Sequence, residues 1–407
     1  MKLSTHTLIY GSAGTLALQI APERLVAHCG ASAAALTDPA AATRAALAAP
    51  LGFPPLAKAV TPGDHVAITL EDDVPREAEI LATVIETVCQ AGVLPCDITV
   101  LRTEEAISCD TRAPLALVAD EMRAKVTLKT HDPTATKELA YLAATDDAEP
   151  IYLSRTVVDA DVAIPIGCVR PHDTLEATGV HGGLWPAFAS VGCRERFHQV
   201  SRRLHREDAA KQKKEADEIA WLLGVSFTVQ VLPAGGDEVA AVLAGDPPTV
   251  WREGQRLCDK LWRDRPGRRA DLVVAALSGG PYQQNWRHVA RAVASARRVV
   301  NHDGMIALVT QVTERPSSSL LRLASGEPYE AILTQLDQDH GIESEAAREL
   351  LMAEDTVRVF LLSELPAEHV EELGLAPVED AADIARLAGR AESVILLSHA
   401  QYAAPTV

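Results

Sequence analysis

Apolar and polar positions along the chain change period in a way that predicts alternating strands and helices. Residues 66–70 form one apolar run of strand length, and the apolar positions between 80 and 88 recur at the spacing of a single helix face. A second short apolar run follows at 98–101. A strand, a helix and a further strand in this order are the unit from which parallel sheets are built. The pattern therefore predicts an α/β protein.

The same patterns continue toward both ends of the chain. Two apolar runs at 7–10 and 16–20, joined by Gly-Ser-Ala-Gly, predict a hairpin or a pair of edge strands. Further strands are expected at 125–128, 139–142, 150–153, 162–168, 225–232, 239–243, 271–277, 306–310, 357–361 and 394–397. Further helices are expected at 38–48, 113–123, 187–198, 200–224, 247–262, from 286 onward, at 320–336 and at 381–391.

The length of 407 residues favours two domains. Residues 263–269 are polar and contain Pro266 and Gly267, which is the clearest linker pattern in the chain. We therefore expect two α/β domains, an N-terminal one over 1–265 that carries the catalytic and cofactor-binding residues and a C-terminal one over 266–407. A ligand cleft is expected between them.

Composition narrows the possible partners. The formal net charge of -18 leaves no basic surface for a nucleic acid, so no nucleic-acid partner is expected. The seven cysteines are scattered and never spaced as C-x-x-C, which indicates a reducing compartment without disulfides or thiolate zinc sites. No apolar run is long enough for a membrane span, so we expect a soluble cytoplasmic protein without a membrane partner. The oligomeric state stays open.

The stretch at 159–199 holds several residues that could take part in catalysis or metal binding. A predicted strand ends in Gly-Cys and opens into a segment that holds His172, His181 and His198. Gly182 and Gly183 lie between these histidines, and glycines allow a ligand to approach the backbone closely. Ligands of open α/β sheets bind at the carboxyl ends of the strands, so we expect the site here.

A second candidate is the acidic turn after the strand at 66–70, where Asp72, Asp73 and Arg76 follow one another. The alternative is structural: Asp72 or Asp73 caps the N-terminus of the next helix. The usual nucleotide, zincin and hydrolase signatures are absent from the sequence.

Four segments in order resemble the lactate racemase family, which uses a nickel-pincer nucleotide. They are Asp-Asp-Val-Pro-Arg at 72–76, Ala-Asp-Val-Ala-Ile at 160–164 running to His172, Gly-Gly at 182–183 followed by Pro-Ala-Phe-Ala-Ser at 186–190 and His198, and Gly-Gly-Pro-Tyr-Gln-Gln-Asn at 279–285 followed by Asn-His-Asp-Gly at 301–304.

The resemblance implies a racemase or epimerase that moves hydride between a 2-hydroxy acid, or a related carbohydrate acid, and the nickel cofactor. His172 matches the catalytic base and His198 the nickel ligand, roles that suit an imidazole. The expected substrate contacts are Gln284, Asn285 and Arg287. The expected cofactor contacts are Asp72, Arg76, Gly182, Gly183 and Trp185.

The chain departs from the family at three places. No lysine follows the glycine pair to tether the cofactor, and Trp185 lies there instead, filling the space or simply packing. The second catalytic histidine is missing, and His181, Glu104 or Glu105 would have to replace it. The arginine of the acidic turn is displaced by one position, to Arg76.

Three functions remain open. The first is an isomerase of the nickel-pincer type whose cofactor is bound noncovalently. The second is an enzyme that has lost nickel chemistry and catalyses another reaction in the same cleft. The third is a non-enzymatic protein that binds an anionic metabolite. Each histidine also has a structural alternative: a structural histidine at 172, a helix-surface position at 198 and a loop position at 181.

Overall fold

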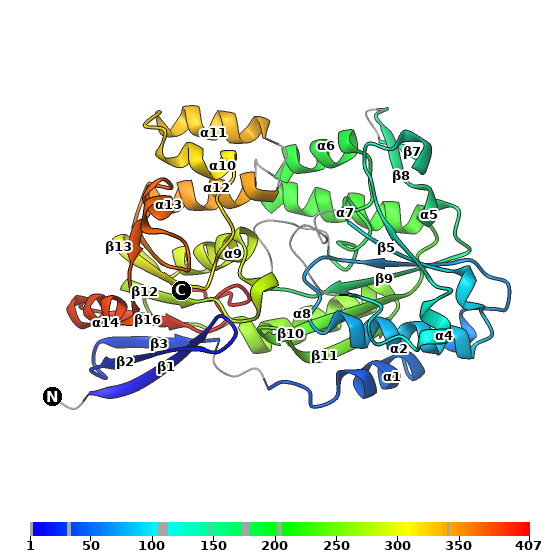
Figure 1. Ribbon diagram of the computed structural model, residues 1–407, viewed down its shortest axis with the longest axis horizontal. Helices are drawn as coiled ribbons and strands as arrows, with labels where there is room; N and C mark the ends of the chain where they lie inside the picture. Colours follow the sequence, from blue (N-terminus) through cyan, green and yellow to red (C-terminus); the bar gives the residue numbers. More distant parts are fainter. Residues whose placement is uncertain are drawn as a thin grey trace.

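The chain forms two six-stranded sheets that lie side by side, each covered by helices (Figure 1). The computed structural model describes residues 3–30, 34–103, 113–145, 148–171, 179–201, 206–339 and 342–407. The predicted α/β fold class is confirmed.

The first sheet has the strand order β11-β10-β9-β4-β5-β6. Its strands are β4 (Val66–Leu70), β5 (Ile98–Arg102), β6 (Thr127–Thr130), β9 (Val162–Cys168), β10 (Thr228–Gly235) and β11 (Glu238–Gly245). All neighbours are parallel except β10 and β11. Every residue of β4 is buried, as expected for a central strand that reads as one apolar run.

Helices cover both faces of this sheet (Figure 1). Those of the first half of the molecule are α1 (Pro39–Ala48), α2 (Glu77–Gln90), α4 (Asp120–Arg123), α5 (Arg155–Val158), α6 (Val191–Ser201), α7 (Arg206–Leu222) and α8 (Pro247–Trp262). α2 packs its apolar face on β4 and β5, whereas α7 packs on the opposite face. A small hairpin of β7 (Leu139–Ala144) and β8 (Pro150–Ser154) lies beside α6.

The second sheet has the order β15-β14-β13-β12-β16-β3, and all its neighbours are parallel. Its strands are β3 (Leu25–Cys29), β12 (Ala270–Ala276), β13 (Val300–Val309), β14 (Arg358–Leu362), β15 (Ala376–Val378) and β16 (Val394–Leu397). Its helices are α9 (Trp286–Arg297), α10 (Ser318–Leu321), α11 (Tyr329–Gln338), α12 (Ile342–Glu354), α13 (Ala367–Glu371) and α14 (Ala381–Arg390).

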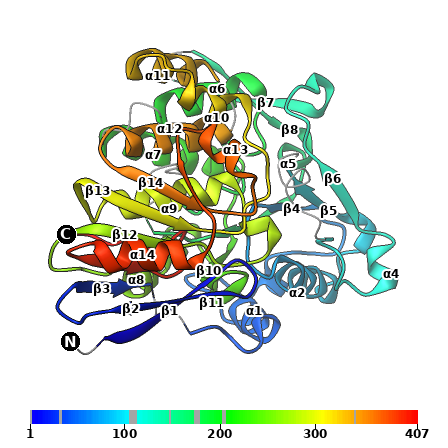
Figure 2. The same ribbon diagram turned by 60° about the vertical axis from the view of Figure 1, so that its left-hand side comes forward.

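The N-terminal residues join this second sheet, although they are distant from it in sequence. β3 pairs with β16, and the hairpin of β1 (Ser4–Tyr10) and β2 (Gly14–Ile20) packs its apolar side on the sheet next to α14 (Figure 2). The predicted domain division at 265/266 stays a prediction. The second sheet nevertheless takes its edge strand and part of one covering layer from residues 4–29.

One element prediction is wrong. Helix was expected over 113–123, but only Asp120–Arg123 is helical; turns before it direct Leu115 and Val118 into the core. Helix or helix-like structure was expected from 187; the regular helix α6 begins at Val191, because Ala189 forms a β-bridge with Leu153. The predicted hairpin at 7–20 is confirmed.

None of the described helices combines the length and the apolar character needed to cross a bilayer.

The packing of β1, β2 and β3 generates a prediction. A fragment of residues 266–407 should lack cooperative thermal unfolding, because its sheet has lost the edge strand and the apolar cover of Leu8, Leu16, Leu18 and Ile20. Joining residues 3–30 to this fragment through a flexible glycine-serine linker should restore a cooperative transition, measured by circular dichroism.

The control for this experiment is the same fusion carrying Leu8→Asp and Leu18→Asp, since both side chains are fully buried. A fragment that unfolds as cooperatively as the fusion would show that the N-terminal residues are dispensable.

Candidate functional site

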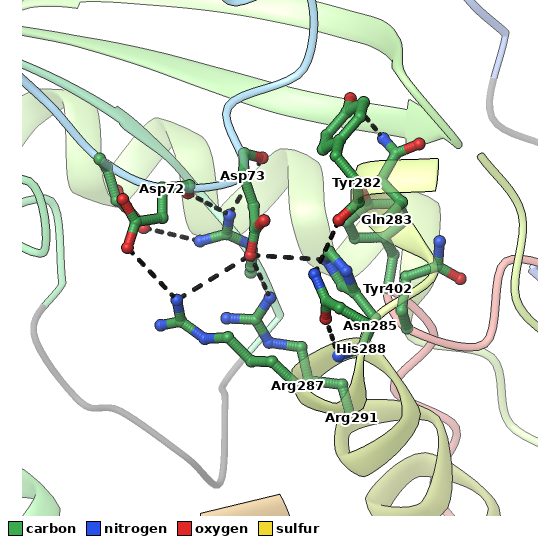
Figure 3. Close-up of polar contacts among 12 residues, drawn as sticks. Asp72, Asp73, Tyr282, Gln283, Asn285, Arg287, His288, Arg291 and Tyr402 are labelled. Carbon is green, nitrogen blue, oxygen red and sulfur yellow. Dashed lines mark hydrogen bonds and ion pairs between the residues drawn. The ribbon is translucent and has the colours of Figure 1, made fainter. Parts of the chain in front are cut away.

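Charged side chains converge where β4 and β9 end and where α9 faces them (Figure 3). Glu71, Asp72 and Asp73 directly follow β4, and Arg170 follows β9. β4 and β9 are parallel neighbours, so their carboxyl ends meet at one edge of the first sheet. We call these residues, together with Arg287, His288 and Arg291 of α9, the strand-end cluster.

Arg170 and Glu71 form the inner pair of the strand-end cluster. Arg170 Nη1 donates to Glu71 Oε1 over 2.7 Å, and Nη2 lies 3.3 Å from the carbonyl oxygens of both Asp72 and Asp73. The other carboxylate oxygen of Glu71 accepts from the Cys168 amide. Burial alone would lower the pKa of Arg170, but the neighbouring anionic groups outweigh burial and hold this pKa well above its usual value. The pair fixes the acidic turn on the end of β9.

Asp73 is the carboxylate on which three side chains of α9 converge. Its Oδ2 lies 3.6 Å from Arg291 Nη1, 3.7 Å from His288 Nε2 and 3.9 Å from Arg287 Nη1. Burial would raise the pKa of Asp73, but these groups and Arg170 lower it well below its usual range. Asp73 also has a φ of 62°, in the left-handed region that a residue with a side chain seldom adopts.

His288 is the neutral member of this group. Its side chain is completely buried, and burial lowers its pKa to about 3, assisted by the three arginines and opposed by Asp73. Both ring nitrogens lack a hydrogen-bond partner among the described residues. The positive charge facing Asp73 at neutral pH therefore comes from guanidinium groups, which stay protonated.

The structure brings the predicted residues Asp72 and Arg287 together. Asp72 Oδ1 accepts a 2.7 Å hydrogen bond from Thr103, which follows β5, and its Oδ2 lies 3.9 Å from Arg287 Nη1. The alternative in which Asp72 or Asp73 caps α2 is wrong. The residue at the N-cap position is Arg76, and its side chain makes no capping hydrogen bond.

Arg76 occupies the rim of the strand-end cluster. Its amide donates to Asp237 Oδ1 over 3.0 Å, and Asp237 also accepts from the hydroxyl of Tyr282. The guanidinium of Arg76 pairs with Glu79 at 2.6 Å and with Glu238 at 3.6 Å. Hydrogen bonding to Glu79 is the main cause that raises the pKa of Arg76. Its predicted cofactor contact stays a prediction.

Gln284 and Asn285 make backbone contacts that hold the loop before α9. Asn285 is the N-cap of the helix, because its Oδ1 accepts from the His288 amide at 3.0 Å and its Nδ2 donates to the carbonyl of Tyr282. Gln284 is buried, and its Oε1 accepts from the Gln311 amide at 2.8 Å. Both residues place α9 relative to the sheet edge, and their contact with substrate stays a prediction.

Gly182 and Gly183 lie in the loop that packs on the same sheet edge. A Cβ at position 183 would lie 3.0 Å from the carbonyl oxygen of Ile166 and 3.3 Å from the Cβ of Glu71. Glycine at 183 therefore allows this loop to approach the ends of β9 and β4 closely. The predicted contact of the two glycines with a cofactor stays a prediction.

His181 precedes the two glycines and is 5% exposed. Burial is the main cause that lowers its pKa to about 4, and the nearest carboxylate oxygen, on Asp217, lies 3.4 Å from Nε2. Its Nδ1 has no hydrogen-bond partner in the described part of the chain. His181 is thus a neutral imidazole at neutral pH, the form in which histidine accepts a proton.

Trp185 packs in a satellite core, away from the strand-end cluster. Its side chain is fully buried, and its ring lies 6.3 Å from that of Phe197, nearly perpendicular to it. The other buried members of this core are Ile151, Leu153, Ala189, Cys193, Ala216 and Ile219. Packing thus accounts for Trp185, and its predicted role beside a cofactor stays a prediction.

The side chains of two predicted residues are not among those that the structure describes. His172, the predicted base, lies outside the described residues, as do Glu104 and Glu105. His198 lies in α6, of which only the backbone is described at this position. Within the described ranges, no group of three His, Cys, Asp or Glu side chains could hold a metal ion. The predicted nickel ligand therefore stays a prediction.

Four members of the strand-end cluster escaped the sequence analysis: Glu71, Arg170, His288 and Arg291. Two signals could have revealed the arginines. Arg287 and Arg291 are four residues apart on a helix, so they share a face that follows a glycine-rich loop. Arg170 comes two residues before His172, at the end of a predicted strand.

The two largely parallel sheets and the charged strand ends define the chain as an α/β protein with a candidate site at the carboxyl ends of its strands. Residues 10–210 match the family model described as the lactate racemase N-terminal domain. Through this region the chain belongs to the lactate racemase-like family, which confirms the resemblance of its motifs.

Solved structures agree with this fold. The chain is similar to the lactate racemase apoprotein from Thermoanaerobacterium thermosaccharolyticum, with a TM-score of 0.77 and 16% identity over 99% of this chain and 100% of that one. It is also similar to a structural-genomics protein from Thermotoga maritima, with a TM-score of 0.63 and 14% identity over 86% of this chain and 95% of that one. Among curated proteins, none matches the chain by sequence.

Asp73→Asn should destabilise the fold by about 3–5 kcal/mol, because it removes a buried carboxylate that lies within 4 Å of two guanidinium groups of α9. The free energy of unfolding, measured with urea at pH 7, checks this expectation. Asp120→Asn is the matched control: it removes an exposed partner of Arg123 and should change stability by less than about 0.5 kcal/mol. Equal effects of the two variants would contradict the role given to Asp73.

Stability should fall as the pH falls below about 6.5, where the unfolded chain protonates His288. In the folded protein His288 binds that proton only near its lowered pKa of about 3. Between pH 6.5 and 3, proton binding therefore favours the unfolded chain. From pH 6.5 to 5, His288 should account for a loss of about 2 kcal/mol. The lowered pKa of Asp73 affects stability only at lower pH. Its contribution to the free energy of unfolding is complete above about pH 4 and is lost below that.

Unfolding by urea at several pH values tests this dependence. His288→Gln should flatten the curve between pH 5 and 6.5, whereas His302→Gln, at a position 75% exposed, should keep the wild-type slope. A slope unchanged in His288→Gln would rule out a neutral buried imidazole.

Proposed function

We propose that the protein is an isomerase of the racemase or epimerase type that acts on a small 2-hydroxy acid. The observation that carries this proposal is the convergence of Arg170, Arg287 and Arg291 at the strand ends. Guanidinium groups bind carboxylates as planar forks, so such a group of arginines suits an acidic substrate. Arg170 also comes two residues before His172, the proposed base.

We propose that a nickel-pincer nucleotide is held without a covalent bond to the protein. A lysine is lacking after the glycine pair, and Trp185 at that place is enclosed in an apolar core. The residues present thus do not fit a tethered cofactor. Arginines at the strand ends fit the anionic groups of a noncovalent one, and His198 is its proposed nickel ligand. The chemistry supplied by this group when bound is reversible transfer of hydride at the alcohol carbon of the substrate.

The chain's own residues would handle the protons. His172 is proposed to take the proton of the substrate hydroxyl. A racemase needs an acid or base on each side of the substrate, and His181 is proposed for the second side. Its position supports this assignment, since it directly precedes the glycine pair in the loop that packs on the ends of β9 and β4.

A second candidate function is the binding of an anionic metabolite without nickel chemistry. The observation in its favour is the group of three arginines at the strand ends, which suits an anionic ligand whether or not a cofactor is bound. The lack of the family's lysine and of its second histidine also supports this candidate.

The first experiment is to produce the protein with and without the enzymes that build the pincer cofactor, and to measure nickel content with native and denatured mass. We expect nickel together with a mass gain that is present only in the native state. His198→Ala should lower the nickel content at least tenfold, whereas His302→Ala, a histidine on another surface, should not.

Absence of both nickel and added mass would rule out the isomerase and favour the binding protein. If nickel is present, His172→Ala decides the proton chemistry: racemisation of a panel of hydroxy acids should be abolished while nickel content stays at the wild-type level.

A further inference from the structure

A half-open pocket lies where the end of β9 meets α9 and the C-terminal segment of the chain. It encloses about 310 Å³, which includes solvent at its mouth. Two of its lining residues, Arg170 and Arg291, also belong to the strand-end cluster, so the pocket adjoins the proposed site. The side chains with polar atoms that line it are Arg170, Arg291, Ser295, Arg298, Gln401 and Tyr402.

The charges of Arg170 and Arg291 are already balanced by carboxylates. Arg170 Nη1 lies 2.7 Å from Glu71 Oε1, and Arg291 Nη1 lies 3.6 Å from Asp73 Oδ2. A further anion in the pocket would therefore compete with carboxylates that belong to the fold. What the pocket offers a ligand has to be found in its individual hydrogen-bonding atoms.

One acceptor among the lining side chains has no donor. Gln401 Nε2 donates to the carbonyl of Ser278 over 2.6 Å, and this bond fixes the orientation of the amide, since the opposite orientation would set two oxygens against each other. The Oε1 of Gln401 is buried and has no hydrogen-bond partner within the described ranges. The whole residue is only 4% exposed, so leaving this acceptor unpaired is costly.

One donor among the lining side chains has no acceptor. Arg170 uses Nη1 and Nη2 inside the strand-end cluster, but its Nε is buried and lacks a hydrogen-bond partner in the part of the chain that the structure describes. The hydroxyls of Ser295 and Tyr402, in contrast, already donate to the carbonyls of Ala403 and Gly236. The pocket thus has an unpaired donor and an unpaired acceptor on two different side chains.

A hydroxyl group matches these two atoms better than a charged group does. It can donate to Gln401 and accept from Arg170, because a hydroxyl has both a proton and lone pairs. A carboxylate has no proton for Gln401. An ammonium group has no lone pair for Arg170 and would also be repelled by its positive charge.

We infer that this pocket binds a hydroxyl group of the substrate, so that the substrate is a 2-hydroxy acid with at least one further hydroxyl. The inference rests on the proposed function in treating the ligand as the substrate. Pro171 lines the pocket and directly precedes His172, which places this subsite next in sequence to the proposed base. Glycerate, which carries a hydroxyl where lactate has a methyl hydrogen, is the simplest acid of this class.

The structural alternative is that a water molecule satisfies both atoms, since water also donates and accepts. A ligand hydroxyl would then only replace hydrogen bonds that the water already makes. This alternative predicts no preference between two ligands that differ by one hydroxyl, and binding measurements can therefore distinguish it.

The test is an NMR titration of the full-length protein, prepared without cofactor, with glycerate and with lactate at neutral pH. The ratio of the two dissociation constants isolates the contact of the added hydroxyl. We expect glycerate to bind more tightly than lactate by about fivefold or more. Isoserine, which carries an ammonium group on the same carbon, should bind no more tightly than lactate.

Two variants locate the preference in the pocket. Gln401→Met should bring the two affinities together, because methionine has a similar length and no amide oxygen. It also removes the hydrogen bond to Ser278, so Ala294→Leu serves as the second variant: it keeps Gln401, fills the pocket from α9 and should likewise abolish the preference. Gln338→Met, at an exposed glutamine of α11, is the matched control and should keep the wild-type ratio.

Equal affinity of the wild type for glycerate and lactate, or no detectable binding of glycerate, would overturn the inference. A preference for isoserine, or a preference for glycerate that persists in Ala294→Leu, would overturn it as well. Nickel and mass measurements are independent of this titration, so failure of the proposed isomerase would leave the measured preference intact.

Discussion

The carboxylate of Asp73 is the contact on which the arrangement of the two sheets depends. It follows a strand of the first sheet and lies within 4 Å of Arg287, His288 and Arg291, all on a helix that covers the second sheet. Removing one partner from a buried ionic group is more damaging than never having had the group, because the remaining charge stays desolvated. Loss of one charged group from this contact between the two halves should therefore cost more stability than the loss of an exposed ion pair.

Much of the core could be predicted because its signals are local. β4, α2 and β5 follow from apolar periodicity within some 35 residues, and the hairpin at 7–20 follows from two apolar runs and a short turn. β3 was missed because its five residues form no long pattern, and its partner β16 lies at the other end of the chain. The supposed helix at 113–123 failed because Leu115 and Val118 reach the core from turns, and periodicity alone does not distinguish this.

The candidate site was predicted less completely than the fold. Asp72 and Arg287 were expected to contribute to the site, and their side chains do lie close together. Asp72 could be found from the sequence because the carboxyl end of a strand is a general location for ligands. His288 and Arg291 were missed because their importance comes from a carboxylate more than 200 residues earlier in the chain. Asn285 has a role that the sequence analysis missed, because its side chain caps the N-terminus of α9; its expected contact with substrate stays a prediction.

The position of β3 has a consequence for how this chain is made. β3 and β16, the strand that it pairs with, are separated in sequence by residues 30–393, so β3 leaves the ribosome long before β16 does. The second sheet therefore cannot be completed until β16 has been made, and the apolar side of the hairpin of β1 and β2 lacks part of its cover until then. Contacts between such distant segments form slowly, and exposed strand edges favour association with other chains. Production of this protein should be limited by the interval between the synthesis of β3 and its pairing with β16.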